Sequence, residues 1–334
     1  MKILIATGIF PPHIGGPAQY AKNLQIEFEK LGHEVKVATY TVERKLPTGI
    51  RHLFFFFKIL PKTFWADAVV ALDTFSVGFP AVIAGRIFNK KIVIRTGGDF
   101  LWEGYVERTN DLVLLRDFYP TRGVKWNTKE RIIFKCVRFT MRHVSAMIWS
   151  TRWQKEMCDK FYGLDSRKSF MVENYYGRKS GNFEAKNITF LGATRPLKWK
   201  NIARLEHAFK RVRETNSEIT LDTKNVPYEE FMEKMQACYV VILVSLGDIS
   251  PNMILDALRL GKPIILTREN GINDRVKDHV MLVDPENEKE IRGAILAMSK
   301  PEVYQEYKKK SENFSFTHGW DEIANEFLIV INKS

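Results

Sequence analysis

The chain has 334 residues, of which 45% are hydrophobic and 27% charged, so it can bury a substantial core, and its length suggests about two domains. This composition excludes a disordered or fibrous protein. The formal net charge is +12, and residues 1–165 hold most of the excess, with 25 Lys and Arg against 15 Asp and Glu. Such a surface attracts anionic membranes, nucleic acid or phosphorylated substrates, and a solvated basic face is the plain alternative.

The chain begins with MKILIATGIF, which is typical of an apolar strand and has too short a hydrophobic region for a signal peptide. The most apolar stretch, residues 53–88, is interrupted by Lys58, Lys62, Asp67 and Asp73. It therefore offers no uninterrupted run of about 18 residues to span a bilayer, and we predict no transmembrane helix. The cysteines show no CxxC spacing, which supports neither a zinc knuckle nor a disulfide framework and favours a reducing compartment. They are Cys136, Cys158 and Cys238.

Short β-rich runs alternate with longer amphipathic segments in the first half of the chain. Helices are predicted at 18–31, after Gly15 and Gly16, and at 151–161, before Gly163. Alternation of strand and helix predicts right-handed βαβ units and a parallel sheet. The predicted strands are Ile3–Ala6, Glu34–Thr39, Ala68–Leu72, Lys91–Arg95, Ala146–Ser150 and Ser169–Val172.

A polar, aperiodic segment at 173–186 is predicted to link this half to a second one that repeats the pattern. The fold class is therefore α/β, with two doubly wound, Rossmann-like domains. We expect one domain at 1–172, a second at 187–312, and a helical segment at 313–334 that packs back on the domains. The second domain has predicted strands at Ile188–Leu191, Glu218–Leu221, Val240–Ser245, Pro263–Thr267 and Val280–Val283, and predicted helices near Ile202–Val212, Tyr228–Ala237, Pro251–Leu260 and Lys289–Met298.

Open parallel sheets bind ligands beyond the carboxyl ends of their strands, where helix amino termini offer free N–H groups. Four polar, glycine-bearing loops follow predicted strands, at residues 11–17, 96–99, 192–200 and 246–252. In the first loop, Gly15 and Gly16 just before a helix would let the backbone approach a phosphate, although a turn without ligand explains them equally well. Arg195 and Lys200 in the third loop could neutralise a diphosphate, with Lys198 as a stand-in for either; two solvated cations are the alternative.

Asp248 and Asp256 are the most informative pair. Ser250 suits the N-cap of a helix and Pro251 its first position, which places Asp248 in the preceding loop and Asp256 over a turn into the helix. Asp256 lies in an apolar setting, where a carboxylate needs a partner. Either Arg259, three residues on, supplies it, or Asp256 accepts hydrogen bonds from a ribose while Asp248 holds sugar hydroxyls.

Residues 247–264, GDISPNMILDALRLGKPI, resemble the acid-x7-acid signature of GT4-type retaining glycosyltransferases, written EGxPNVLLEAMACGKPVI. Asp248 and Asp256 stand where that family has glutamates, which shortens each side chain by roughly 1.5 Å. The family also has an Arg-x4-Lys loop after the first strand of its second domain, which Arg195 and Lys200 match. Its Gly-Gly loop after the first strand of the chain is matched by Gly15 and Gly16.

This resemblance, which covers essentially the whole chain, implies the GT-B fold, with two domains facing across a cleft, and a metal-independent transferase that retains anomeric configuration. The sequence contains no Asp-x-Asp pair, so we expect no metal and no cofactor. The resemblance further implies that Arg195 and Lys200 bind the donor diphosphate, Asp248 the sugar and Asp256 the ribose, and that Ser250 and Asn252 add donor contacts. By the same resemblance, Gly15 and Gly16 serve the phosphate and acceptor side, and Asp99 faces the donor sugar.

The expected function is transfer of a sugar from a nucleoside-diphosphate donor to a glycan or lipid-linked acceptor, in cell-surface polysaccharide or glycoconjugate synthesis. A sugar-nucleotide epimerase of the same fold and a non-catalytic nucleotide-sugar-binding protein remain alternatives. Basic and aromatic residues in segments 51–62 and 129–142 predict contact with an anionic membrane or a lipid-linked substrate, with core aromatics and a solvated stripe as the alternative. We expect no nucleic-acid partner, since no binding module accompanies them, and a cytoplasmic protein, peripheral on the inner face of the membrane.

Overall fold

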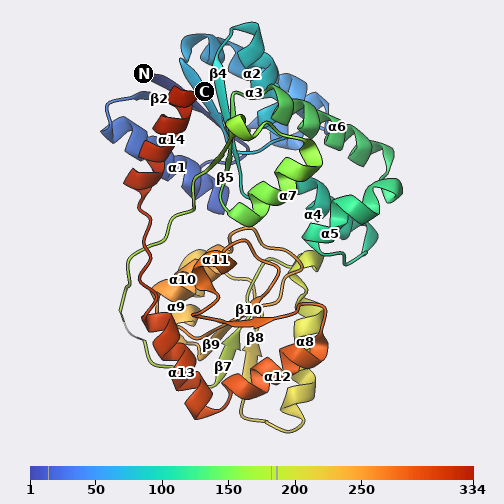
Figure 1. Cartoon of the computed structure of the whole chain (residues 1–334), viewed down its shortest axis with the longest axis vertical. Helices are drawn as coiled ribbons and strands as arrows, with labels where there is room; N and C mark the ends of the chain where they lie inside the picture. The colour runs from blue at the N-terminus through green and yellow to red at the C-terminus, as the bar shows by residue number, and fades with distance from the viewer. Residues whose placement is uncertain (14, 182, 186) are drawn as a thin grey trace. The chain divides into compact units, whose positions relative to one another are not determined.

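The computed structural model describes residues 1–13, 15–181, 183–185 and 187–334. The chain forms two compact units, each built on one parallel sheet with helices around it (Figure 1). Unit 1 comprises Met1–Leu101, Lys125–Tyr175 and His318–Ser334, and unit 2 comprises Trp102–Val124 and Tyr176–Thr317. The predicted fold class, two Rossmann-like α/β domains, is confirmed.

The sheet of unit 1 has six strands in the order β2-β1-β3-β4-β5-β6, all parallel. Its central strands are buried on both faces, which explains why they stand out in the sequence as continuous apolar runs. The strands are β1 (Lys2–Thr7), β2 (Glu34–Thr39), β3 (Ala68–Ala71), β4 (Lys91–Thr96), β5 (Ala146–Trp149) and β6 (Ser169–Met171).

Helices cover both faces of this sheet. Right-handed crossovers place α2, α3, α6 and α7 on one face, in line with the contacts between neighbours in that series, and α1 on the other face. Helix α6 begins with a capping box between Asn127 and Glu130, and α7 begins at the N-cap Thr151. The helices are α1 (Gly16–Lys30), α2 (Ile50–Trp65), α3 (Gly78–Ile87), α6 (Thr128–His143), α7 (Arg152–Tyr162) and α14 (Trp320–Lys333).

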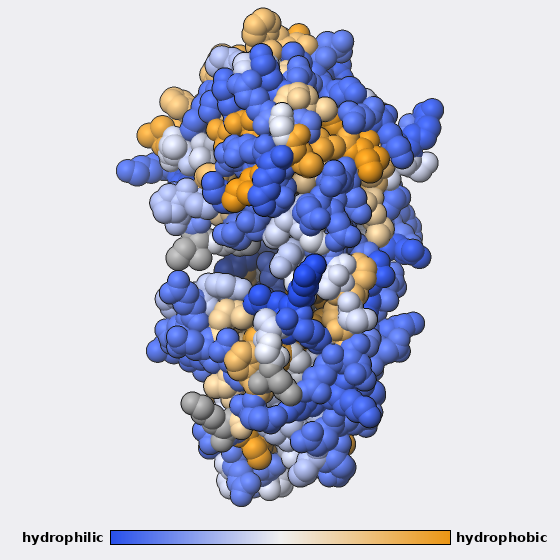
Figure 2. All heavy atoms as spheres, turned by 90° about the vertical axis from the view of Figure 1, so that its left-hand side faces the viewer, coloured by the Kyte–Doolittle hydropathy of each residue, from blue (hydrophilic) through white to orange (hydrophobic). Residues whose placement is uncertain are grey.

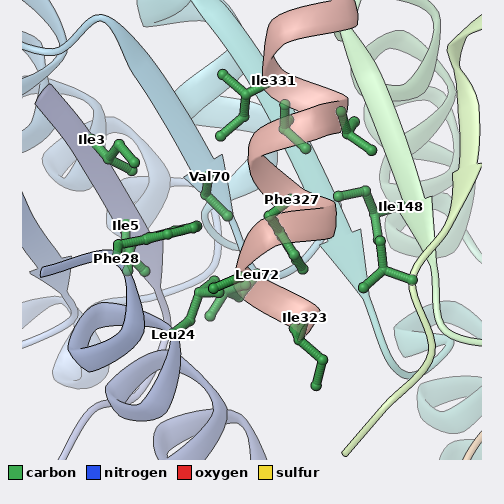
Figure 3. Packing of buried hydrophobic residues seen from close by; sticks show 14 of the residues in the cluster. Ile3, Ile5, Leu24, Phe28, Val70, Leu72, Ile148, Ile323, Phe327 and Ile331 are labelled. Atoms are coloured by element: carbon green, nitrogen blue, oxygen red, sulfur yellow. The ribbon is translucent and has the colours of Figure 1, made fainter. Parts of the chain in front are cut away.

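Helix α14, at the end of the chain, returns to unit 1 and packs beside α1. Figure 3 shows Phe327 of α14 within a cluster that includes Phe28 of α1 and the sheet residues Val70 and Ile148. Phe327 is fully buried, and its ring lies 6.4 Å from that of Phe28. The last helix therefore completes the core on this face of the sheet.

Replacing Phe327 with Ala is expected to lower the free energy of unfolding by about 3–5 kcal/mol, because the substitution removes buried apolar surface and leaves a cavity. Urea unfolding followed by circular dichroism measures this loss. Ile329→Ala on the same helix is the matched control: its side chain is 52% exposed, and we expect a change within about 0.5 kcal/mol. Equal losses in the two variants would contradict the packing described here.

The sheet of unit 2 has five parallel strands in the order β11-β10-β9-β7-β8. They are β7 (Thr189–Leu191), β8 (Thr220–Asp222), β9 (Val240–Leu243), β10 (Ile264–Thr267) and β11 (Met281–Val283). The helices around them are α8 (Ile202–Arg213), α9 (Tyr228–Ala237), α10 (Asn252–Arg259), α11 (Asn273–Val276), α12 (Glu288–Met298) and α13 (Pro301–Glu312).

Unit 2 also includes a segment from the first half of the chain, residues 102–124. This segment contains most of α4 (Phe100–Thr109) and all of α5 (Leu115–Arg122). The Trp102 ring lies 5.4 Å from that of Trp199, and Leu115 N–H donates to the Leu246 carbonyl at 3.1 Å. A Cβ at Gly247 would meet the Leu115 Cβ at 2.5 Å, so glycine is needed there. The chain thus passes between the units at more places than the predicted linker.

Candidate functional site

Lys200 and Asp248 form an ion pair at the carboxyl ends of β7 and β9. Lys200 lies in a short 3-10 helix (Lys198–Lys200) after β7, and its Nζ is 2.5 Å from Asp248 Oδ2. Ser245 Oγ donates to the same carboxylate oxygen at 3.2 Å. Both charged side chains are 12% exposed, so water screens their attraction less than it would on an open surface. The two residues that the sequence placed in separate loops are in contact.

Asn201 anchors the loop that carries Lys200. It has a left-handed backbone, with φ of 61°, which asparagine tolerates better than most residues, and it is 3% exposed. Its side-chain amide donates to the carbonyls of Val244, at 3.0 Å, and Pro285, at 2.9 Å. The sequence did not single out Asn201, since only the tertiary contacts show what its amide binds.

The backbone of Asp248 is bound on both sides by the loop after β10. Its N–H donates to the Glu269 carbonyl, and its own carbonyl accepts from Gly271 N–H, each at 2.9 Å. These bonds accompany a parallel bridge between Asp248 and Asn270. The Asp248 carboxylate is therefore held where the loops after β7, β9 and β10 meet.

Asp256 lies within α10, and two neighbours contact its carboxylate. Tyr228 OH, at the start of α9, donates to Oδ2 at 3.2 Å, and the Arg259 guanidinium lies 3.4 Å from Oδ1. Burial raises the pKa of the Asp256 carboxyl above its ordinary value, while Arg259 and Tyr228 act in the opposite direction. The Arg259 contact considered as the structural alternative is thus present, and Tyr228 is an additional partner that the sequence did not indicate.

Helix α10 begins one residue later than predicted. Pro251 is its N-cap and Asn252 its first residue, so the prediction of Ser250 as N-cap and Pro251 as first position is wrong. The reason is the extended backbone of Pro251, with ψ of 105°, which keeps it outside the helix. Ser250 Oγ is buried and has no hydrogen-bond partner among the described residues, whereas the Asn252 side chain is exposed. An unpaired buried hydroxyl at a helix start is available to a ligand.

The other two cations of the β7 loop differ in their contacts. Lys198 is bound to α4: its backbone N–H donates to the Glu107 carboxylate at 2.7 Å, and its Nζ donates to the Glu107 carbonyl at 2.9 Å. Arg195 is exposed. Because Lys198 is occupied, Arg195 is the better placed of the two to accompany Lys200 at an anion.

Glu269 is a buried acid beside Asp248 that the sequence did not indicate. It is 4% exposed, and its Oε1 lies 3.0 Å from Arg116 NH1 of α5. Its Oε2 is buried without a hydrogen-bond partner in the described part of the chain. Burial raises the pKa of Glu269 to about 7, with Arg116 opposing the shift. No sequence signal links it to Arg116, because the two are far apart along the chain.

A carboxyl group with a raised pKa in the folded state stabilises the fold at low pH and loses that contribution as the pH rises through the folded value. For Glu269 this loss falls between about pH 4.5 and pH 7 and amounts to up to about 3 kcal/mol. We expect Glu269→Gln to flatten the dependence of unfolding free energy on pH in this range, as measured by urea titrations at several pH values. An unchanged slope would show that Glu269 is ionised throughout.

The remaining candidates belong to unit 1. Gly15 precedes α1 with φ of 151°, where a side chain would be strained and a Cβ would lie 3.1 Å from Ile9, and Gly16 is the first residue of the helix. Ile14, in the same predicted loop, lies outside the described residues. Asp99 follows β4 and is half-buried. Burial raises the pKa of the Cys158 thiol, and the negative charge of nearby Asp99 raises it further. Gly15, Gly16 and Asp99 therefore lie in a different unit from Lys200 and Asp248.

Lys262, from the Gly-Lys-Pro end of the motif, has a structural role. It is 1% exposed, and its Nζ donates to the backbone carbonyls of Phe183, Gln236 and Cys238.

Among the residues that the structure describes, no group of three or more His, Cys, Asp or Glu side chains is arranged to hold a metal ion. No described helix is both long and apolar enough to cross a membrane.

Comparison with solved structures identifies proteins of similar fold. No family model matches the chain, and no curated protein matches its sequence. Among solved structures, HepE from Anabaena, in complex with UDP, is similar over 100% of both chains, with a TM-score of 0.65 and 13% identity. Sucrose-phosphate synthase from Thermosynechococcus elongatus matches 99% of this chain and 98% of its own, with a TM-score of 0.67 and 11% identity. The chain thus has a fold similar to that of GT-B glycosyltransferases.

A further structural neighbour represents another reaction class. A Listeria monocytogenes protein, assigned as a UDP-N-acetylglucosamine 2-epimerase, matches 99% of this chain and 95% of its own, with a TM-score of 0.59 and 12% identity. At such low identities these likenesses concern the fold alone.

Proposed function

We propose that the protein is a glycosyltransferase that moves a sugar from a nucleoside-diphosphate donor, bound by unit 2, to a glycan or lipid-linked acceptor. The observation that supports this most is the Lys200–Asp248 pair, a cation and an acid 2.5 Å apart at the ends of neighbouring strands. Phosphates and sugars bind at that edge of a doubly wound sheet. HepE, of similar fold, has been solved with UDP-glucose as well as with UDP.

In this proposal each side chain has a distinct role. Lys200 and Arg195 bind the diphosphate and stabilise the negative charge that develops as the sugar departs. Asp248 accepts hydrogen bonds from sugar hydroxyls, and Ser250, whose buried hydroxyl has no partner in the described chain, donates to the same part of the donor. Asp256 and Tyr228 hold the ribose. Gly15, Gly16, Asn252 and Asp99 are proposed as further contacts.

The protein supplies its own cations, so we propose a reaction without metal or cofactor, with retention of configuration. Retention requires the acceptor oxygen to bond to the anomeric carbon on the face that the diphosphate leaves. The acceptor proton then passes to the departing phosphate, and no group on the protein forms a covalent intermediate. A chelator should leave turnover unchanged, and the anomeric configuration of the product, determined by NMR, should equal that of the donor.

Two other functions fit the same fold. A sugar-nucleotide epimerase is favoured by the likeness to the Listeria protein. A protein that binds the donor without reaction is favoured by the aspartates at positions 248 and 256, which are shorter than the glutamates of the GT4 motif.

Release of nucleoside diphosphate from a panel of donors, with and without a crude lipid-linked acceptor fraction, separates the three functions. Release that depends on acceptor supports the transferase. Turnover without acceptor supports the epimerase, and donor binding without turnover supports the third function. Thermal shift against nucleoside diphosphates identifies the base beforehand, because a ligand that binds the folded state raises its melting temperature.

A further inference from the structure

Helix α2 of unit 1 presents an apolar face to solvent. Every exposed residue of this helix is apolar, and these residues recur along one side of it. We call the set the α2 stripe: Ile50, Leu53, Phe54, Phe57, Pro61 and Phe64. The exposed fractions of Phe57 and Phe64 are 61% and 68%, far above those of side chains in a core. Single exposed apolar residues are ordinary, but a whole helical face of them marks an interaction surface.

The opposite face of α2 packs against the rest of unit 1. Phe55 and Ile59 are fully buried against unit 1. Lys58 Nζ lies 2.9 Å from Glu43, and Lys62 Nζ donates to the Val37 carbonyl at 3.1 Å. The sequence grouped these lysines with a basic membrane surface, but in the structure both make contacts within the protein.

The positive charge near this helix comes instead from α6, on the same face of the sheet. Its exposed side chains include six basic ones, which we call the α6 basic row: Lys129, Arg131, Lys135, Arg138, Arg142 and His143. In the described part of the chain, Lys135, Arg138 and Arg142 have no salt-bridge partner. Their charges are therefore available to an anionic surface.

Helix α3 lies between the α2 stripe and the α6 basic row, since it contacts both α2 and α6. The Phe64 ring lies 5.4 Å from Phe88, just after α3, and the Phe79 ring of α3 lies 6.0 Å from Phe139 of α6. Arg86 and Ile87 at the end of α3 are exposed, and they continue the mixture of apolar and basic groups. Figure 2, which faces the left-hand side of Figure 1, shows hydrophobic residues gathered on unit 1 more than on unit 2.

We propose that unit 1 docks on an anionic lipid bilayer, with the α2 stripe inserted at the level of the headgroups and the α6 basic row against lipid phosphates. Amphipathic helices bind membranes in this way, by burying apolar side chains and attracting anionic headgroups. The stripe is one helix wide, which suits a lipid surface. A second copy of the chain would have to place its own basic row near this one, and like charges would oppose the contact.

Flotation of the full-length protein with lipid vesicles tests this inference. One vesicle contains phosphatidylcholine alone, and the other contains phosphatidylcholine and phosphatidylglycerol in equal parts. We expect the protein to float with the anionic vesicle and to be released by salt, because screening weakens attraction between charges. Phe54→Ser combined with Phe57→Ser should lower the partition coefficient about tenfold. Lys135→Gln combined with Arg138→Gln and Arg142→Gln should also lower it and remove most of the salt dependence.

Each variant has a matched control. Leu31→Ser combined with Ile329→Ser removes apolar side chains, 43% and 52% exposed, that belong to other elements of the same unit. Lys210→Gln combined with Arg211→Gln and Arg213→Gln removes as many charges from α8 in unit 2. Both controls should float as the parent does. Melting temperatures confirm that each variant is folded.

Three outcomes would overturn the inference: equal recovery of the parent from neutral and anionic vesicles, unchanged flotation of the α2 variant, or equal losses in variants and controls. A lipid-free dimer that the α2 variant converts to monomer would assign the stripe to a second copy of the chain instead. The inference does not depend on sugar transfer. Donor binding by the folded α2 variant, measured in solution, therefore separates failure of the membrane contact from failure of the proposed function.

Discussion

Lys200→Ala is expected to lower kcat/KM for donor turnover by roughly 100- to 1000-fold, which is the typical cost of removing one group that stabilises developing negative charge. Lys200 is the cation of the β7 loop that contacts Asp248, and 12% exposure keeps its charge partly shielded from water. Steady-state kinetics with the donor found by thermal shift measures the effect. Nucleoside diphosphate should also bind more weakly, because in the proposed reaction the same ammonium group contacts the diphosphate before and during transfer.

Two further variants separate chemistry from folding. Lys200→Gln keeps a hydrogen-bond donor for Asp248 but removes the charge, so it should stay folded and remain impaired. Lys198→Ala removes a cation two residues away that is bound to Glu107, and it should keep donor turnover within a few-fold of the parent. If Lys198→Ala were the more impaired of the two, the diphosphate site would have to be reassigned.

Much of the fold is predictable because both sheets consist of parallel strands. Such strands are covered on both faces and therefore appear as short apolar runs between polar loops. The prediction of Ile3–Ala6 corresponds to β1 at Lys2–Thr7, and that of Val240–Ser245 to β9 at Val240–Leu243. Boundaries shift where a strand is exposed: β8 is at Thr220–Asp222 and not at 218–221, because its partly exposed residues give a weak apolar signal.

Segment 102–124 was not predictable in the same way. Its packing depends on contacts between Trp102 and Trp199 and between Leu115 and Gly247, and no local pattern reveals pairings across such distances along the chain. The exposed face of α2 could be predicted only in part. The sequence grouped the run of four phenylalanines, 54–57, with nearby basic residues as a membrane-facing surface, but it could not show that Phe55 is buried while Phe54 and Phe57 face solvent.

The residues of the candidate site also differ in whether the sequence could predict them. Lys200 and Asp248 could be paired from sequence, because the ends of parallel strands meet at one edge of a sheet. Asn201 and Glu269 could not, since their importance comes from an amide bound to two distant carbonyls and from an acid buried against Arg116. The sequence therefore indicated the charged groups that we propose face a ligand, and the structure added the groups that hold the loops in place.

Asp256→Ala is expected to weaken nucleotide binding by about 10- to 100-fold, since a hydrogen bond to a charged group contributes about 1.5–3 kcal/mol. Isothermal titration with the nucleoside diphosphate measures the loss. Asp256→Glu restores the length found in the GT4 motif, and we expect it to bind at least as well as the parent. Binding should also weaken as the pH falls, because burial raises the pKa of this carboxyl and the protonated form accepts fewer hydrogen bonds.

Arg259→Ala decides whether Asp256 serves a ligand or only the helix. Arg259 lies 3.4 Å from Asp256, so a purely structural pair predicts that both alanine variants lose similar stability and that neither loses affinity. A ribose contact predicts that only Asp256→Ala loses affinity, while Arg259→Ala binds as the parent does, apart from a small change through the pKa of Asp256. Tyr228→Phe removes the hydroxyl that donates to the other carboxylate oxygen. A loss of affinity there, with an unchanged melting temperature, would place the ribose against both side chains.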